Sequence, residues 1–424
     1  MARSLEQLSS IVSRNATALS QKIERQNTSS PTIQSIDSPT LSEIDSVAAA
    51  ELANAARELQ ALVQSPRQQL NLLAFSLFDS ISVGTLLEFN ILELVPLEGT
   101  ISLSELAAKA GLLEDKLTRI VRYAITIFVF HEPKPGYIAH TVISAAIARD
   151  PKFVDFLRMS LVDLAPINAA LPLALRKWPQ TEAINESAVQ AAHNTDLPWF
   201  QWLSSDATMQ ERFDKAMAGF SRVEGNAAGR SGNIDIAAYP WATALPSDAV
   251  VVDVGGGSGH VSKALAAAFP SFKITVQDRE QVITAARQAA GGPGSSTISY
   301  QIHSFWDPNP LVGADVYFLR QVIHDWPRKE AIDILRALIP ALKPGARVLI
   351  SEFMVPELAD DDLLEAKMIR QMDLQMMAIL NAKERTKDEL VELFTGADSR
   401  FRFNAVYQSP EDRKVCIFEA IWEP

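Results

Sequence analysis

A short apolar strand followed by a glycine-rich turn constrains the fold of this chain more than any other stretch. Residues 250–260 are VVVDVGGGSGH, where a predicted buried strand breaks at once into Gly255, Gly257 and Gly259. Glycines at this spacing let the backbone turn sharply and point free N–H groups at a ligand. The stretch lacks the Lys-Ser/Thr pair of a phosphate-binding loop, and histidine replaces the last glycine of a G-x-G-x-x-G pattern. The remaining motif, D-x-G-x-G-x-G from Asp253, predicts a nucleotide-binding turn.

A second predicted strand supports this interpretation. Residues 272–278 (FKITVQD) end in the carboxylate of Asp278, about 20 residues after the glycines, where an acidic residue can accept hydrogen bonds from both ribose hydroxyls. A glycine-rich turn alone could equally be an ordinary connection between a strand and a helix. The two features together favour a nucleotide-type ligand.

Length and charge limit the classes of protein to which the chain can belong. Its 424 residues suggest two domains. The formal net charge of −12 argues against nucleic acid or an anionic membrane surface as a partner. We expect no membrane span, because no apolar run reaches about 18 residues, and no signal peptide, because residues 1–24 lack an apolar segment. The single cysteine, Cys416, excludes internal disulfides and favours a reducing, cytoplasmic location.

The first part of the chain is predicted to be mostly helical. Residues 27–42 are rich in Ser, Thr, Gln and Pro, so we expect a flexible tail over residues 1–45. Apolar residues then recur at three- and four-residue spacing up to Val63. A further helix over residues 66–87 is apolar on more than one face, which is typical of a helix buried in a core or against a second subunit.

Residues 101–147 predict a helix-turn-helix with a wing. Ser104 can cap a short helix, Gly111 ends it, a second helix covers residues 114–126, and a hairpin follows with Pro135 and Gly136 at its tip. Such a unit can bind DNA through its second helix. That helix carries acidic residues beside its basic ones, and the whole chain is acidic, so a structural or dimerising role is favoured over DNA binding.

From residue 249 onward, strands and helices alternate regularly. This order predicts a parallel sheet with helices on both faces, closed by a terminal hairpin. Ligands bind such sheets beyond the carboxyl ends of the strands. His324, which follows the strand ADVYFLR, and Glu352, which ends the strand RVLISE, fall at this edge. Glu384 is a third candidate, after a methionine-rich helix.

His324 is a candidate general base. An imidazole with a pKa near 6.5 can accept a proton from a phenol, and a carboxylate bound to its other nitrogen would fix the tautomer and stabilise the imidazolium. The alternative from the residues alone is a buried structural histidine. No group of His, Asp and Glu residues has the sequence spacing of metal ligands, so we expect no metal.

These motifs resemble a known family. DVGGGSG, Asp278, FLRQVIHDWP, LISE and KERT are similar to class I S-adenosylmethionine-dependent O-methyltransferases of the caffeate and flavonoid type, in the form common among fungal secondary-metabolite enzymes. The resemblance extends from about Glu43 to the end of the chain. It implies an α/β, Rossmann-like seven-stranded catalytic domain over residues 196–424 and a mainly helical winged-helix dimerisation domain over residues 46–195. It also implies a homodimer acting on a small molecule.

The resemblance also implies roles for individual residues. His324 would be the general base, flanked by Glu352 and Glu384. Nine residues would bind the cofactor, S-adenosylmethionine: Asp253, Gly255, Gly257 and Gly259 at the methionine part, Asp278 at the ribose, Ser304, Phe305 and Trp326 near the adenine, and Arg320 at the family's basic position. Three further residues would line the substrate pocket: Met217, Asp373 and Met376. Where the family usually has an acidic residue, this chain has Ser304, which suggests weaker cofactor affinity.

Two enzymatic functions follow from the resemblance. The first is transfer of a methyl group to a hydroxyl of a phenolic or polyketide-type metabolite. The second is the activity of fungal members that keep the fold and the cofactor but catalyse pericyclic reactions without methyl transfer. Several of these alter the histidine of the HDW motif, whereas this chain keeps His324 and both glutamates, which favours methyl transfer. A winged-helix regulator without enzymatic activity is disfavoured by the acidic charge.

Overall fold

The chain forms two compact units. The computed structural model describes residues 3–224, 231–289, 298–356, 363–408 and 415–424. The first unit comprises Met1–Pro166, Thr208–Phe220 and Asp360–Leu364, and the second comprises Ile167–Ala207, Ser221–Ala359 and Glu365–Pro424. The first unit thus includes short segments from later in the chain. The predicted domains are consecutive ranges, 46–195 and 196–424, so they do not assign these later segments to the first unit.

The first unit begins with a capped helix where the sequence predicts a flexible tail. Helix α1 (Leu5–Arg25) starts at Ser4, whose hydroxyl accepts a hydrogen bond from Gln7 N, while the Gln7 side chain accepts one from Ser4 N. Its apolar side packs against α3 (Ser46–Val63), and α2 (Leu41–Ile44) lies between them in the chain. The tail prediction is therefore wrong for residues 5–25. The Ser- and Pro-rich composition belongs to the connection between α1 and α2.

Helices α4 (Pro66–Phe75) and α5 (Leu77–Glu88) expose an unusual amount of apolar surface. Two stretches are long and apolar enough to cross a membrane, judged by length and composition only. They are Pro66–Glu88, with a mean hydropathy of 1.6, and Pro151–Lys177, with a mean hydropathy of 1.2. No such stretch is expected from the sequence when an unbroken apolar run is required. Core helices pass the same test, so one or two such stretches are weak evidence for a membrane. Within the first unit, α5 packs against α8 (Glu114–Thr126).

The predicted helix-turn-helix and hairpin are present in the first unit. Strands β1 (Ile101–Ser102), β2 (Phe130–Lys134) and β3 (Tyr137–His140) form an antiparallel sheet of order β1-β3-β2. Gly111 ends α7 (Leu103–Ala110) with φ +67°, and Gly136 forms the hairpin tip with φ +81°. The predicted cap is wrong by two residues, because it is Ser102 that accepts the hydrogen bond from Glu105 N. The remaining elements of this part are α6 (Ile91–Leu94), α9 (Val142–Ala148), α10 (Pro151–Arg158) and the π-helix η1 (Met159–Asp163).

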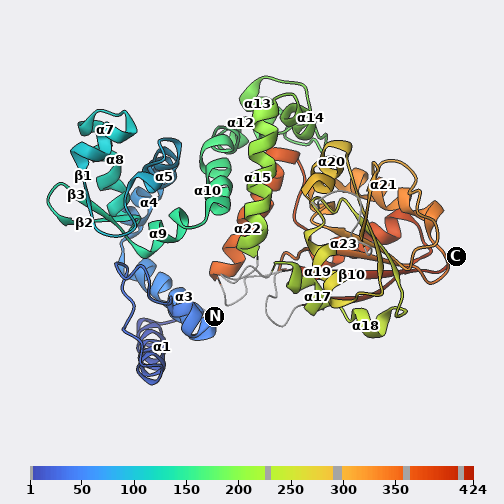
Figure 1. Ribbon diagram of the computed structural model, residues 1–424, viewed down its shortest axis with the longest axis horizontal. Coiled ribbons are helices and arrows are strands. Elements are labelled where there is room, and N and C mark those ends of the chain that lie inside the picture. The colour runs from blue at the N-terminus through green and yellow to red at the C-terminus, as the bar shows by residue number, and fades with distance from the viewer. Residues whose placement is uncertain (1–2, 225–230, 290–297, 357–362, 409–414) are drawn as a thin grey trace. The chain divides into compact units, whose positions relative to one another are not determined.

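The second unit contains the predicted seven-stranded sheet (Figure 1). Its order is β6-β5-β4-β7-β8-β10-β9, and β10 is antiparallel to both of its neighbours, so β9 and β10 form the predicted terminal hairpin. The strands are β4 (Val250–Val254), β5 (Lys273–Asp278), β6 (Ile298–Ile302), β7 (Val316–Arg320), β8 (Arg347–Phe353), β9 (Phe401–Gln408) and β10 (Val415–Trp422). Strand order reverses between β4 and β7, which is where sheets of this kind bind ligands.

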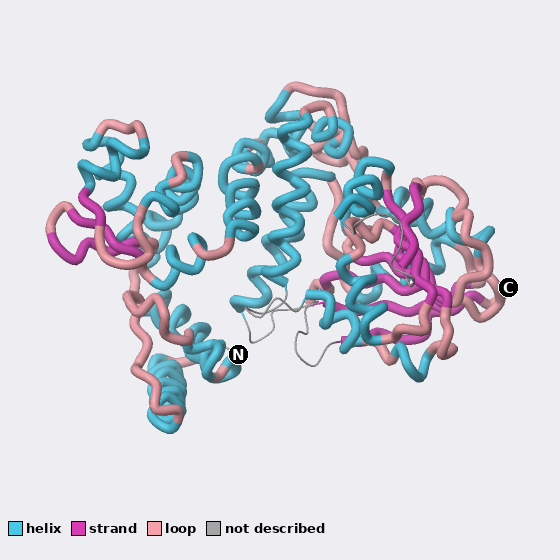
Figure 2. Tube along the Cα trace, in the orientation of Figure 1, coloured by secondary structure: helices cyan, strands magenta, loops and turns pink. Residues whose placement is uncertain are grey.

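Both faces of this sheet are covered, as the continuous apolar character of its strands predicts (Figure 2). Val252 and Ile350 pack with α21 and α23, whereas their neighbours Val251 and Leu349 pack with α18 and α19. This alternation follows from the period of two along a strand. The helices and turns from residue 165 onward are α11 (Ala165–Ala169), α12 (Leu171–Lys177), α13 (Ala188–His193), α14 (Trp199–Ser204), α15 (Ala207–Glu224), α17 (Ser231–Ala238), α18 (Trp241–Ala244), α19 (His260–Ala268), α20 (Glu280–Ala289), η2 (Ile323–Asp325), α21 (Arg328–Leu338), η3 (Ile339–Ala341), α22 (Leu363–Leu380) and α23 (Lys387–Ala397).

The strand register brings the predicted site residues to one edge. Parallel pairing sets Val254 beside Gln277 and Arg320 beside Ser351. The glycine turn after β4, Asp278 at the end of β5, the turn after β7 and Glu352 near the end of β8 therefore share the carboxyl edge of the sheet.

Candidate active site

The turn after β4 requires its glycines. Gly255, Gly257 and Gly259 have φ of +73°, +58° and +72°, a conformation that glycine adopts at little cost. Gly256 is required for a different reason, which the sequence analysis missed. A Cβ at this position would lie 2.5 Å from Cγ and Oδ2 of Asp253. The turn is therefore packed directly onto that carboxyl group.

Asp253 supports the turn from within the protein. Its side chain is buried and accepts a hydrogen bond from Ser262 Oγ at 2.6 Å. Burial raises the pKa of Asp253 to about 6. That Asp253 also contacts the cofactor stays a prediction. What the structure shows is that its carboxyl group packs against Gly256.

Asp278 joins the glycine turn to the end of β5. Its Oδ2 accepts a hydrogen bond from Gly257 N at 2.9 Å, and its Oδ1 accepts one from Arg279 N at 2.7 Å. Near this turn, the side-chain atoms His260 Nε2 and Tyr300 OH are buried without a hydrogen-bond partner among the described residues. A glycine cradle, a carboxylate and unsatisfied polar atoms fit a polar ligand such as the cofactor implied by the motifs.

Aromatic rings gather beside the predicted adenine position. Trp326 makes edge contacts with Phe305 and Trp306, at centroid distances of 5.8 and 4.6 Å, and a tilted contact with Phe200 at 5.8 Å. Phe305 and Trp326 were predicted, and the structure brings them together. Trp306 and Phe200 were missed, and Phe200 comes from α14, more than 100 residues earlier in the chain. Ser304 directly precedes the cluster, and its carbonyl accepts a hydrogen bond from Asp307 N.

Arg320 lies in a buried ion pair. Its Nε donates to Asp235 Oδ2 at 2.7 Å, and the two side chains are 9% and 0% exposed. Ser351 Oγ donates to the other oxygen of Asp235. Sequence reasoning missed Asp235, because nothing in α17 marks it as part of a strand-end site. The predicted contact of Arg320 with the cofactor stays a prediction.

The short turn η2 carries His324 and is held by two buried side chains. Oε1 of Glu352 accepts hydrogen bonds from the backbone N–H groups of residues 322, 323 and 324, at 3.1, 2.8 and 3.2 Å. Arg385, which is 4% exposed, donates from Nη1 to Ile323 O at 2.9 Å and from Nη2 to Trp326 O at 2.6 Å. The turn thus has its N–H groups bound by a carboxylate and its carbonyls bound by a guanidinium. Arg385 belongs to the quoted KERT motif, but the sequence analysis gave it no role.

Glu384 reaches the histidine because the chain after α22 runs beside the end of β8. Val355 N donates to Arg385 O at 3.0 Å, and Asp373 Oδ1 accepts a hydrogen bond from Glu384 N at 3.1 Å. Asp373, predicted as a pocket residue, therefore contacts the Glu384 backbone. Met376 is buried in the same helix, α22. Met217 belongs to the other unit, so its place in a pocket stays a prediction.

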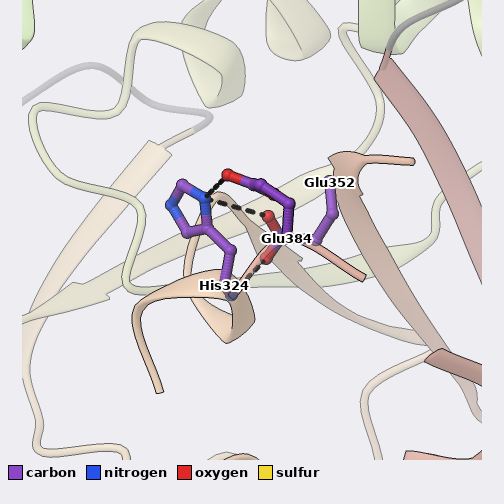
Figure 3. A group of neighbouring side chains, drawn as sticks. All are labelled: His324, Glu352 and Glu384. Atoms are coloured by element: carbon purple, nitrogen blue, oxygen red, sulfur yellow. Dashed lines mark hydrogen bonds and ion pairs between the residues drawn. The ribbon is translucent and has the colours of Figure 1, made fainter. Parts of the chain in front are cut away.

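The structure brings His324, Glu352 and Glu384 together, as Figure 3 shows. Nδ1 of His324 lies 2.8 Å from Glu384 Oε1 and 3.8 Å from Glu352 Oε2. An ionised carboxylate only accepts hydrogen bonds, so Nδ1 carries the proton of this bond. Nε2 then has its lone pair free in the neutral ring. Asp325 Oδ1 lies 3.5 Å from Nε2.

The charges around His324 shift its titration. Burial disfavours the charged imidazolium, but the carboxylates of Glu384, Glu352 and Asp325 outweigh burial and raise the pKa of His324 well above 6.5. Burial in turn raises the pKa of Glu352 to about 7 and that of Asp325 to about 6. The raised pKa of His324 corrects the ordinary value near 6.5 that is expected from its residue type alone. The correction follows from three carboxylates around one ring.

The same three side chains are compact enough to surround a metal ion. One potential ligand atom from each of His324, Glu352 and Glu384 lies within 4.8 Å of the others. Their sequence spacing did not show this, because they come from three different elements. The absence of a metal stays a prediction.

We predict that Gly256→Ala weakens binding of S-adenosylmethionine, the cofactor that the motifs imply, by at least about tenfold. The added Cβ would collide with the Asp253 carboxyl group and displace the turn. Titration calorimetry would measure the affinity, and thermal unfolding would report any general loss of stability. The exposed neighbour Ser258→Ala is the matched control. Equal affinity of Gly256→Ala and wild type would show that this turn does not hold the cofactor.

Comparison with known proteins agrees with this site. Residues 181–400 match the family model of the O-methyltransferase domain. The chain is 36% identical over 373 residues to chlorophenol O-methyltransferase of Trichoderma longibrachiatum, covering 87% of this chain and 79% of that protein. It is 35% identical over 375 residues to the O-methyltransferase VdtC of Byssochlamys spectabilis, covering 87% and 85%.

Solved structures share the fold over nearly the whole chain. OxaC in complex with sinefungin and meleagrin has a TM-score of 0.78 at 24% identity, covering 97% of this chain and 99% of that chain. LepI in complex with S-adenosylmethionine has a TM-score of 0.75 at 24% identity, covering 97% and 100%. These likenesses show the fold, and the family model and the relatives show the family. The chain belongs to the S-adenosylmethionine-dependent O-methyltransferases and is an enzyme of that family with S-adenosylmethionine as its cofactor.

Proposed function

We propose that the enzyme methylates a hydroxyl of a phenolic or polyketide-type secondary metabolite, with His324 as the general base. The observation that carries the proposal is the hydrogen bond between His324 Nδ1 and Glu384 Oε1 at 2.8 Å. It fixes the tautomer in which Nε2 can accept a proton. The chlorophenol O-methyltransferase among the relatives supports a phenolic acceptor.

Each residue of the site has a defined task in this reaction. The bound cofactor supplies an electrophilic methyl group on a sulfonium sulfur. Glu352 and Arg385 hold the turn that carries His324, so the position of Nε2 is fixed before the acceptor binds. His324 removes the hydroxyl proton at Nε2 as the oxygen attacks, and Glu384 stabilises the imidazolium through the Nδ1–H hydrogen bond. The glycine turn and Asp278 orient the cofactor.

We predict that His324→Ala lowers methyl transfer by about 10²–10⁴-fold, the usual contribution of a positioned base. The assay follows transfer of labelled methyl from S-adenosylmethionine to a panel of phenols and polyketide-type hydroxyl compounds. Calorimetry on the same variant should give unchanged cofactor affinity, because the glycine turn is intact. His131→Ala, in the first unit, controls for loss of a histidine. A variant that keeps the wild-type rate would remove His324 from the mechanism.

A second function on the same fold is a pericyclic reaction with bound cofactor and no methyl transfer. Two observations support this second function. The first is the structural likeness to LepI and to a protein described as a pericyclic reaction enzyme, each with a TM-score of 0.75. The second is the uncharged Ser304 beside the aromatic cluster. The labelling assay separates the two functions. Tight cofactor binding without transfer to any acceptor would favour the pericyclic reaction.

We predict that kcat/KM rises with pH, with a midpoint above 6.5. Burial lowers the pKa of His324, but the carboxylates outweigh burial and raise it, so the ring keeps its second proton to a higher pH than an ordinary histidine and becomes a base as that proton is lost. Glu384→Gln removes the nearest negative charge. It should move the midpoint to lower pH while lowering the maximal rate at least about tenfold, because the imidazolium loses its partner. A midpoint that stays or moves upward in Glu384→Gln would contradict this account.

We also infer that the first unit is a winged-helix dimerisation domain and that the enzyme is a homodimer. Nine large apolar side chains between residues 62 and 81 are 46% to 68% exposed, and clusters of exposed apolar side chains mark interaction surfaces: Leu62, Val63, Leu70, Leu72, Leu73, Phe75, Leu77, Phe78 and Ile81. A second copy of the chain would cover this surface. The net charge of −12 disfavours an anionic membrane as the alternative cover.

We predict that Leu73→Glu lowers the mass in solution from that of a dimer to that of a monomer. A charge at the centre of an apolar interface stays solvated only if the interface opens. Light scattering after size-exclusion chromatography would measure the mass. Val312→Glu, on an exposed residue of the second unit (76% against 67% for Leu73), should not change it. A wild-type monomer would disprove the dimer.

A further inference from the structure

Gln321 has an unusual backbone conformation for its residue type. It lies between Arg320, the last residue of β7, and the turn that carries His324. Its φ is +52°, in the left-handed region that side chains other than glycine rarely adopt. Its N–H donates to Ser351 O at 2.9 Å, which continues the pairing of β7 with β8. Such strain persists where surrounding structure enforces it, and it is concentrated at functional sites.

The side chain of Gln321 is unusual as well. Both polar atoms of its amide, Nε2 and Oε1, are buried and have no hydrogen-bond partner among the residues that the structure describes. An amide offers two donor hydrogens and an acceptor oxygen, and native proteins seldom bury such a group unsatisfied. An unsatisfied amide on a strained backbone indicates a group kept for a ligand.

Other unsatisfied atoms lie at the same edge of the sheet. Glu352 Oε2 and Glu384 Oε2, at the candidate base, are buried without a hydrogen-bond partner in the described chain, as are His260 Nε2 and His303 Nε2 after β4 and β6. Within the described residues of the second unit, these unsatisfied atoms thus follow the carboxyl edge where ligands bind. Gln321 takes the place between the cofactor turn and the base.

The position of Gln321 favours the acceptor over the cofactor as its ligand. The cofactor already has the glycine turn and Asp278, which are joined by the Gly257–Asp278 hydrogen bond. Gln321 is three residues before His324. Glu352 binds the N–H groups of the three residues that follow Gln321, up to His324 itself, and Gln321 N donates to Ser351 O in the same strand. Strand β8 thus holds the backbone at Gln321 through Ser351 O and the backbone at His324 through Glu352, so the two residues are positioned by the same strand.

We infer that the Gln321 amide hydrogen-bonds an oxygen of the acceptor that neighbours the hydroxyl to be methylated. The enzyme then prefers a phenol with a second hydroxyl or a carbonyl in the ortho or peri position over a phenol without such an oxygen. This inference rests on the proposed methylation and goes beyond it, because it names the substrate feature that is selected. An apolar neighbour of the reacting hydroxyl would leave the amide unsatisfied.

The test compares matched acceptors by binding, without turnover. Wild type, Gln321→Leu and Gln321→Gly are saturated with S-adenosylhomocysteine. Calorimetry then gives the Kd of catechol beside 2-methylphenol and of 1,8-dihydroxynaphthalene beside 1-naphthol. Wild type should bind the dihydroxy member of each pair about tenfold more tightly, and both variants should lose this preference. The glycine variant tolerates the positive φ, so it separates loss of the amide from strain or misfolding.

Three results would overturn the inference. They are a wild type without preference, a variant that keeps the preference, and a loss confined to affinity for S-adenosylhomocysteine, which would make Gln321 a cofactor residue. Labelled methyl transfer by wild type is measured in parallel. Preferred binding without any transfer would disprove the methylation while leaving the role of Gln321 intact, so the two failures are distinguishable.

Discussion

The carboxylate of Glu352 is the interaction on which the site depends. One of its oxygens accepts hydrogen bonds from three successive backbone N–H groups, and the other faces the ring of His324. A single side chain from β8 therefore determines both the path of the turn after β7 and the electrostatic environment of His324. Because β7 and β8 are neighbouring parallel strands, the sheet itself sets the distance between them. The accuracy of the site comes from strand pairing, which is far stiffer than a loop.

This arrangement stabilises a local excess of negative charge inside the protein. Glu352, Glu384 and Asp325 surround one histidine, and the buried Arg385 faces the same turn from the other side. Burial lowers the pKa of Arg385 and raises those of Glu352 and Asp325, so each charge is held at a cost in solvation. Replacing such groups by apolar residues would often make a protein more stable. Their presence at a cost in stability is what the proposed proton transfer would require.

Much of this architecture could be predicted from the sequence, and the omissions have physical reasons. Strand-helix alternation predicted the sheet, and the motif residues His324, Glu352 and Glu384 were found because each lies at or near the end of an element. Gly256 was missed because the requirement for glycine there is steric and depends on where the folded chain places the Asp253 carboxyl group. Asp235 and Phe200 approach the site from distant helices, and no local pattern marks such contacts. Helix α1 was obscured by the polar connection that follows it.

The position of Cys416 has a practical consequence. It is the single cysteine of the chain, lies in β10 between β8 and β9, and is fully buried. A thiol reagent can reach it only when the sheet opens there, so its rate of modification reports the free energy of that opening under native conditions. The chain thus carries its own probe of sheet stability. The same probe would show whether bound cofactor tightens the strands that carry the site.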